Sequence, residues 1–132
     1  MEETLLAWIR ASRKRQFLLF VAGRLSGIHG WKRTHTPIAY QVIDKTAIIH
    51  FDGSERLTIA NATDVVGQST GELFVRDANE VRFTWCSDHD PDQDCEEIFR
   101  KVDRAILFNR TDDLYTTSTV YGHSAGQIVV LR

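Results

Sequence analysis

Residues 37–60 read PIAYQVIDKTAIIHFDGSERLTIA, in which apolar and polar side chains alternate in three short runs. Alternation with a period of two is typical of a β-strand that buries one face. The dipeptides at 44–45 and 52–53 separate the runs, and the second is Asp-Gly, which supplies the positive φ that a tight hairpin turn needs. The sequence therefore predicts a meander of three antiparallel strands over residues 38–42, 47–51 and 56–60.

Strand patterns continue toward the C-terminus. Residues 64–66 lie between turn-forming residues and predict a short edge segment. Two more strands, 72–76 and 80–86, are predicted on either side of a turn at 77–79. The face of the second strand that we expect to be buried carries Val81, Phe83 and Trp85. Further β-leaning stretches are residues 105–108, 114–121 and 127–131.

Helical spacing predicts two helices. The first covers residues 4–15, where Thr4 is a residue type that caps helices and the apolar face carries Leu5, Trp8 and Ile9. The second is a short helix over 96–103, where Ile98 and Val102 are four residues apart.

The apolar run at residues 17–21 suits either a strand or a helix, because a short run of this kind has no decisive periodicity. Gly23, Gly27 and Gly30 follow it too closely for a stable helix. We therefore favour a strand over 16–25, followed by a loop that extends to Pro37.

The composition is that of an ordinary globular domain. The chain has 132 residues, of which 42% are hydrophobic and 26% charged. This length favours a single domain, residues 1–132. We expect the α+β class dominated by antiparallel β-structure: a bent sheet, roll or small barrel with the N-terminal helix on one face or at an open end.

Charge is unevenly distributed along the chain. Residues 1–36 carry seven Lys and Arg against two Glu, whereas the remaining residues are acidic on balance. Interleaved cations and aromatic rings suit phosphates and stacked bases. The loop at 23–37 and the neighbouring basic helix are therefore the expected working surface. The candidate binding residues are Arg13, Lys14, Arg15, Arg24, Trp31, Lys32, Arg33 and His35.

The pentapeptide GHSAG at 122–126 fits the G-x-S-x-G pattern of the nucleophile elbow in α/β-hydrolases. An elbow must lead from a strand into a helix, but only six strand-like residues follow this pentapeptide. We interpret it as a bend between strands and assign no catalytic residue. His50 falls within a strand and is interpreted as a hydrogen-bonded residue of the sheet.

The acidic stretch at 86–97 contains four aspartates, one histidine and both cysteines. It does not fit a calcium loop, because Gln93 or Cys95 stands where the sharp-turn glycine is required. A zinc site from Cys86, His89 and Cys95 has suitable ligand types, but the spacing matches no standard motif. We expect a solvated acidic turn with free thiols, no metal and no cofactor.

No apolar run is long enough to cross a bilayer and the first residues do not resemble a secretory signal, so a cytoplasmic protein without membrane contact is expected. The prediction for function is a non-catalytic binding or interaction module that contacts a polyanion through its basic N-terminal segment. Its partner would be a protein or a nucleic acid, and self-association stays open. The alternative is a small hydrolase or other enzyme with a sheet-lined pocket.

Overall fold

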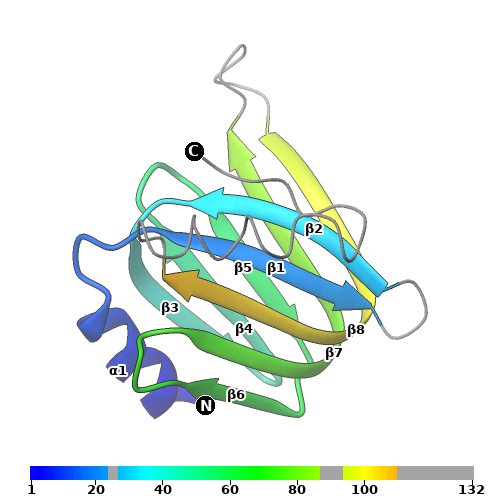
Figure 1. Cartoon of the computed structure of the whole chain (residues 1–132), viewed down its shortest axis with the longest axis horizontal. Helices are drawn as coiled ribbons and strands as arrows, with labels where there is room; N and C mark the ends of the chain where they lie inside the picture. Colours follow the sequence, from blue (N-terminus) through cyan, green and yellow to red (C-terminus); the bar gives the residue numbers. More distant parts are fainter. Residues whose placement is uncertain (24–26, 87–93, 110–132) are drawn as a thin grey trace.

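The computed structural model describes residues 1–23, 27–86 and 94–109, and for residues 27–31 only the backbone. Within this part of the chain one helix, α1 (Glu2–Ala11), precedes eight strands that pair in antiparallel fashion (Figure 1). The strands are β1 (Phe17–Gly23), β2 (Gly27–Thr34), β3 (Pro37–Ile43), β4 (Thr46–Phe51), β5 (Arg56–Ala60), β6 (Asp64–Gly67), β7 (Leu73–Cys86) and β8 (Asp94–Asn109). No helix in the described residues is long and apolar enough to span a membrane.

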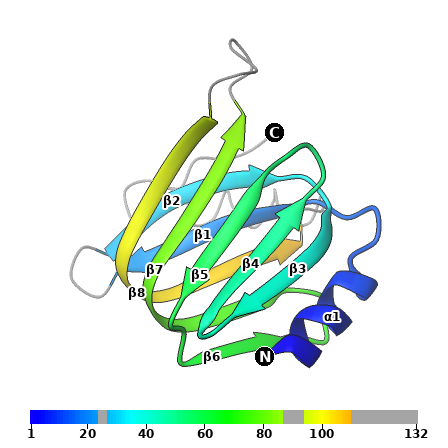
Figure 2. The same ribbon diagram turned by 180° about the vertical axis from the view of Figure 1, so that it is seen from behind.

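The strands form one open sheet in the order β2-β1-β8-β7-β5-β4-β3, and β6 pairs with β7 beside this path. β1 pairs with the C-terminal half of β8, whereas β5 pairs with the C-terminal half of β7. Because these segments lie at opposite ends of the long β7–β8 pair, the sheet has two parts. Figures 1 and 2 show that it curls, so that β1 and β2 lie across from β3, β4 and β5.

Both parts contribute to a single hydrophobic core. Phe17, Leu19 and Val21 of β1 belong to the same buried cluster as Ile49 of β4 and Phe83 of β7. The other members of the cluster are Leu5, Trp8, Ala47, Phe51, Leu57, Ile59, Leu73, Val75, Ala78, Val81, Phe99, Val102, Ala105 and Leu107. The predicted α+β fold is therefore confirmed, and its sheet is open rather than closed as a barrel. The inner faces of the two parts are filled with apolar side chains, as the alternation along β4, β5 and β7 predicts.

Helix α1 contacts the edge strand β3 and the short strand β6 (Figure 2). Leu5 and Trp8 are its buried residues. The predicted limits, 4–15, were wrong at both ends, because the helix begins at Glu2 and ends at Ala11. Its C-cap is Ser12, and Lys14 has φ 61°, so the chain turns away before the basic run is complete.

The predicted strands of residues 37–60, the edge segment at 64–66 and the strand at the apolar run 17–21 are confirmed as β3, β4, β5, β6 and β1. The second connection is longer than a two-residue turn. Residues 52–55 separate β4 from β5, with positive φ at both Gly53 and Ser54.

Three further predictions were wrong. The expected loop to Pro37 contains β2, which pairs with β1 from Gly23↔Gly27 to Phe17↔Thr34. Residues 96–103 are part of β8 rather than a helix, because β8 is paired with β7 there. The residues Ile98 and Val102 are not on one buried face: Val102 is buried and Ile98 is exposed.

The third error is the turn expected at 77–79. Residues 73–86 form one continuous strand that is paired with β8 from Leu73↔Leu107 to Cys86↔Asp94. Asp77, with φ 49°, is turn-like in conformation but bends the strand without reversing it. The β-leaning stretches 114–121 and 127–131, the acidic stretch at 87–93 and the GHSAG pentapeptide lie outside the described residues.

Candidate functional site

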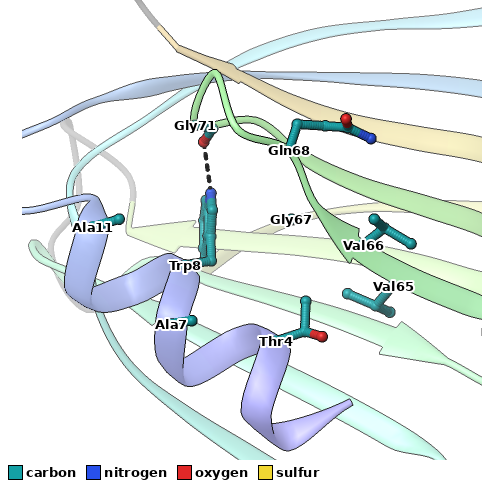
Figure 3. A pocket seen from close by; sticks show the side chains of 9 residues that line it. All are labelled: Thr4, Ala7, Trp8, Ala11, Val65, Val66, Gly67, Gln68 and Gly71. Atoms are coloured by element: carbon teal, nitrogen blue, oxygen red, sulfur yellow. Dashed lines mark hydrogen bonds between the residues drawn. The ribbon is translucent and has the colours of Figure 1, made fainter.

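A groove of about 450 Å³ has α1 on one side and, on the other, β6 and the turn that follows β6 (Figure 3). The helix wall consists of residues that helical spacing places on one face, namely Thr4, Ala7, Trp8 and Ala11. The opposite wall consists of Val65, Val66, Gly67, Gln68 and Gly71. Most of these side chains are apolar and several are small, so the groove suits one or two apolar side chains of a ligand.

Trp8 fixes the two walls relative to each other. Its side chain is only 4% exposed, its ring packs against Phe17, and its Nε1–H donates a hydrogen bond of 2.9 Å to the carbonyl of Gly71. The turn that holds Gly71 is itself closed by hydrogen bonds from Gln68 N to Glu72 O at 2.8 Å and from Gly71 N to Gln68 O at 2.9 Å. The groove is therefore formed before any ligand enters.

A positive charge stands at the Gly71 end of the groove. The nearest guanidinium nitrogen of Arg15 is 3.0 Å from the position that a Cβ on Gly71 would occupy. Arg13, Lys14 and Arg15 are all exposed, and none of them has an ion-pair partner among the described residues. The groove thus combines apolar walls with a cationic end.

Among the remaining predicted binding residues whose side chains the structure describes, Lys32, Arg33 and His35 do not line this groove. Arg33 and Lys32 are adjacent on β2 and pair with Leu18 and Leu19 respectively, so their side chains point to opposite faces of the sheet. Lys32 forms an ion pair of 3.3 Å with Glu97 and lies 4.7 Å from the ring centre of Trp85. Arg24 and the side chain of Trp31 lie outside the described part of the structure.

His35 has a different role from the other predicted residues. Its Nδ1 is 3.0 Å from one oxygen of Glu55, and its backbone N–H donates to the other oxygen at 2.7 Å. Glu55 is 8% exposed, whereas the imidazole is largely exposed. The contact between His35 and Glu55 connects the β2–β3 link to the β4–β5 loop. A second contact connects the same two segments, because the backbone N–H of Asp52 donates a hydrogen bond of 2.8 Å to the carbonyl of Thr36. No local sequence pattern indicates the contact between His35 and Glu55, because the two residues are 20 positions apart.

A second cavity of about 420 Å³ lies beside this pair, and Glu55 and His50 contribute to its lining. The predicted sheet role of His50 is confirmed, since its Nε2 is 3.0 Å from Gln41 Oε1. Among the described residues, no hydroxyl or thiol forms a hydrogen bond with the imidazole of His35. The space between the two parts of the sheet is filled by the core. The His35–Glu55 pair therefore acts as a structural connection between the β2–β3 link and the β4–β5 loop.

The two cysteines are free thiols on neighbouring strands. Cys95 is paired with Trp85 and Cys86 with Asp94, so alternation directs the two thiols to opposite faces of the sheet. Cys86 Sγ lies 3.6 Å from Asp94 Oδ1, and partial desolvation together with this carboxylate raises the pKa of the Cys86 thiol. His89 lies outside the described residues, within which no group of three metal-ligating side chains gathers.

No protein-family model matches the chain, and neither the curated proteins nor the solved structures contain a significant match to it.

Proposed function

We propose that the protein is a non-catalytic binding module whose α1–β6 groove accepts an apolar side chain of a protein partner, while acidic residues next to that side chain meet Arg15. The observation that supports this proposal is the combination of apolar walls with an exposed guanidinium at one end of the groove.

The two kinds of contact are complementary in their energetics. Burial of one leucine or phenylalanine side chain is favourable by about 1.5–3 kcal/mol. A guanidinium that binds a carboxylate through two parallel hydrogen bonds adds direction and strength to the contact. Because the bond between Trp8 and Gly71 holds the groove open in advance, little ordering of this surface opposes binding.

The charges along α1 suggest how the partner is oriented. Glu2 and Glu3 are exposed at the N-terminal end of the helix, and residues 13–15, RKR, follow its C-terminal end. Acidic residues of the partner are repelled at the first end and attracted at the second. The acidic part of the partner would therefore lie beside the turn after α1.

An acidic protein segment is favoured over a nucleic acid for two reasons. Binding along a phosphate backbone requires a continuous track of cations. Within the predicted set, Lys32 is engaged by Glu97 and His35 by Glu55, and neither adds to such a track. An apolar groove also offers little to a phosphate backbone.

The experiment measures fluorescence anisotropy of a labelled heptapeptide that has one phenylalanine between acidic residues. We expect measurable binding that weakens at least 5-fold when the peptide phenylalanine is replaced by alanine. Arg15→Ala should weaken binding 5- to 10-fold, because one charge-assisted contact is lost. Val66→Asp should abolish it, because a carboxylate then stands in the apolar wall next to the acidic peptide.

Two exposed residues outside the groove provide matched controls. Arg100→Ala removes a cation from β8, and Ile38→Asp places a carboxylate on an exposed isoleucine of β3. Both variants should bind the heptapeptide as the unmodified protein does. Equal weakening by control and groove variants, or no binding of the peptide at all, would overturn the proposal.

A nucleic-acid ligand would give a different result. In that case a single-stranded oligonucleotide would bind more tightly than the heptapeptide, with steep dependence on salt concentration. The combined variant Arg13→Ala, Lys14→Ala, Arg15→Ala would then lose oligonucleotide binding, and Val66→Asp would have little effect. This outcome rejects the acidic protein segment as the ligand.

A further inference from the structure

β6 is an edge strand that lies along the α1–β6 groove. Within the described part of the chain it pairs with β7 on one side and with no strand on the other. Four consecutive residues of the chain, 65–68, line the groove, although successive side chains of a strand point to opposite faces (Figure 3). A groove that met only one face of β6 would be lined by alternate residues. The groove therefore runs along the edge of β6 that is not paired with β7.

The register of β6 on β7 identifies the backbone groups at this edge. In an antiparallel pair, residues that bond to the partner strand alternate with residues whose N–H and C=O groups point away from it. Gln68 N donates to the carbonyl of Glu72 at 2.8 Å, so Gln68 and the second residue before it, Val66, bond to β7. The backbone N–H and C=O groups of Val65 and Gly67 therefore point away from β7, toward the groove.

This edge is accessible and lacks the features that commonly block the edge of a sheet. Val66, Gly67 and Gln68 are all exposed. Charged side chains and proline protect many edge strands from pairing with another chain, but residues 65–67 are Val-Val-Gly. The edge strand β3, by contrast, begins with a proline. The edge of β6 is therefore open to pairing with a further strand.

The helix wall of the groove leaves room for a peptide backbone. Ala7 and Ala11 are four residues apart on the groove face of α1, and both are exposed. Their side chains are single methyl groups, and Gly67 on the opposite wall has no side chain. A main chain can therefore approach β6 closely without a clash.

We propose that the partner segment binds in an extended conformation and adds a strand to the edge of β6. This inference rests on the proposed function, because it states how the acidic segment with its apolar side chain occupies the α1–β6 groove. The backbone N–H and C=O groups of Val65 and Gly67 form hydrogen bonds with the main chain of the segment. Strand addition of this kind takes affinity from main-chain hydrogen bonds and specificity from a pocket for a side chain.

Charge determines which end of the added strand is acidic. Asp64 is exposed at the first residue of β6, whereas Arg15 lies beside Gly71, beyond the last residue of the strand. Acidic residues of the segment are repelled at the first end and attracted at the second. The added strand therefore places its apolar side chain along β6 and its acidic residue next to Arg15.

The first test places one N-methyl group at a time on the backbone amides of the heptapeptide described above. Strand pairing uses every second amide, so methylation at either of two positions separated by one residue should weaken binding about 10-fold. Methylation of the amide between them is the matched control, and it should change the affinity by less than about 2-fold because that amide points away from β6. Equal affinities across the series, or equal weakening at every position, would overturn the added strand.

The second test follows hydrogen exchange of the protein's own amides by nuclear magnetic resonance. A saturating amount of the heptapeptide should slow exchange at Val65 and Gly67 by about 10-fold, because both amides become hydrogen-bonded. Val66 is the internal control, since its N–H bonds to β7 with or without the peptide. Unchanged exchange at Val65 and Gly67 in the saturated complex would overturn the added strand.

The proposed function and the added strand fail in different ways. If the unmethylated heptapeptide binds and the groove variants weaken it, but neither test shows the pattern of alternate amides, the proposed function stands and the added strand is rejected. If the unmethylated heptapeptide does not bind at all, both are rejected.

Discussion

The turn after β6 depends on one residue, Gly71. Its φ is +101°, a conformation that side chains rarely adopt, and a Cβ would clash with Asn109 Nδ2. Its carbonyl accepts the bond from Trp8, so this glycine positions one end of the groove.

Gly71→Ala should lower the free energy of unfolding by about 2 kcal/mol, because both the backbone conformation and the space exclude a methyl group. Gly67→Ala is the matched control. A Cβ there would meet only Thr4 Cγ2 at 3.9 Å, an ordinary contact, and the expected change is within about 0.5 kcal/mol. Denaturation by urea measures both values. Similar losses for the two variants would contradict this account of the turn.

Cys86 gives a prediction for the dependence on pH. Partial desolvation and the Asp94 carboxylate raise its pKa, so less thiolate is present near neutral pH than for an ordinary cysteine. In a Cys95→Ser background, Asp94→Asn should lower this pKa and speed alkylation of Cys86 by iodoacetamide at pH 7.5. The difference in alkylation rate between the two proteins should shrink at a pH where Cys86 is ionised in both of them. An unchanged or slower reaction would mean that the carboxylate does not act on the thiol.

At the scale of the element, β7 and β8 bend without ending. Asp77 has φ 49° and Lys101 has φ 53°, and both lie where regular pairing between the two strands is interrupted. Each residue is in a left-handed conformation that costs about 1 kcal/mol for a non-glycine side chain. The pairing on both sides of the bend maintains these conformations.

Lys101→Gly should leave the free energy of unfolding unchanged or raise it by up to about 1 kcal/mol, because glycine adopts positive φ without strain. Arg100→Gly, one position earlier on the same strand, should lower it by about 1 kcal/mol, because Arg100 is paired with Glu80 in regular strand conformation. Thermal or urea unfolding of the two variants decides the matter. If Lys101→Gly destabilises as much as Arg100→Gly, the bend is not where strain is stored.

At the scale of the whole molecule, β2 and β3 are consecutive in the chain but lie at opposite ends of the sheet order. Residues 35–36 connect them, so the two ends of the sheet must meet at this corner. Glu55 binds the corner through both of its carboxylate oxygens, one to the backbone N–H and one to the imidazole of His35.

Glu55→Ala should lower the free energy of unfolding by about 2–3 kcal/mol, since a buried, charge-assisted contact is lost. Asp52→Ala removes an exposed carboxylate of the same loop that accepts the Gly53 N–H at 3.1 Å, and should cost about 0.5 kcal/mol. Denaturation curves compare the two variants. Equal losses would show that the corner does not depend on Glu55.

The local pattern was enough to predict most strands and the buried faces of β5 and β7. The local pattern was misleading where strand pairing in the folded sheet overrode the local preference of the residues. Asp77 has a turn-like conformation within a continuous strand, and residues 96–103 have helical spacing but are paired with β7. The basic run at 13–15 was also visible in the sequence. Its position at the end of a groove was not, because Gly71 is more than 50 residues away along the chain.

By itself, the sequence determined which residues alternate and therefore which side chains can share a buried face, since the period of a strand is a local property of the backbone. It also determined that the positive charge of the N-terminal segment is concentrated at residues 13–15. The tertiary structure alone decided that the sheet curls at Asp77 and Lys101, that Glu55 reaches His35, and that α1 meets β6 to form a groove. These contacts join residues far apart in the chain, and their formation depends on how the whole sheet bends, which no short stretch of sequence specifies.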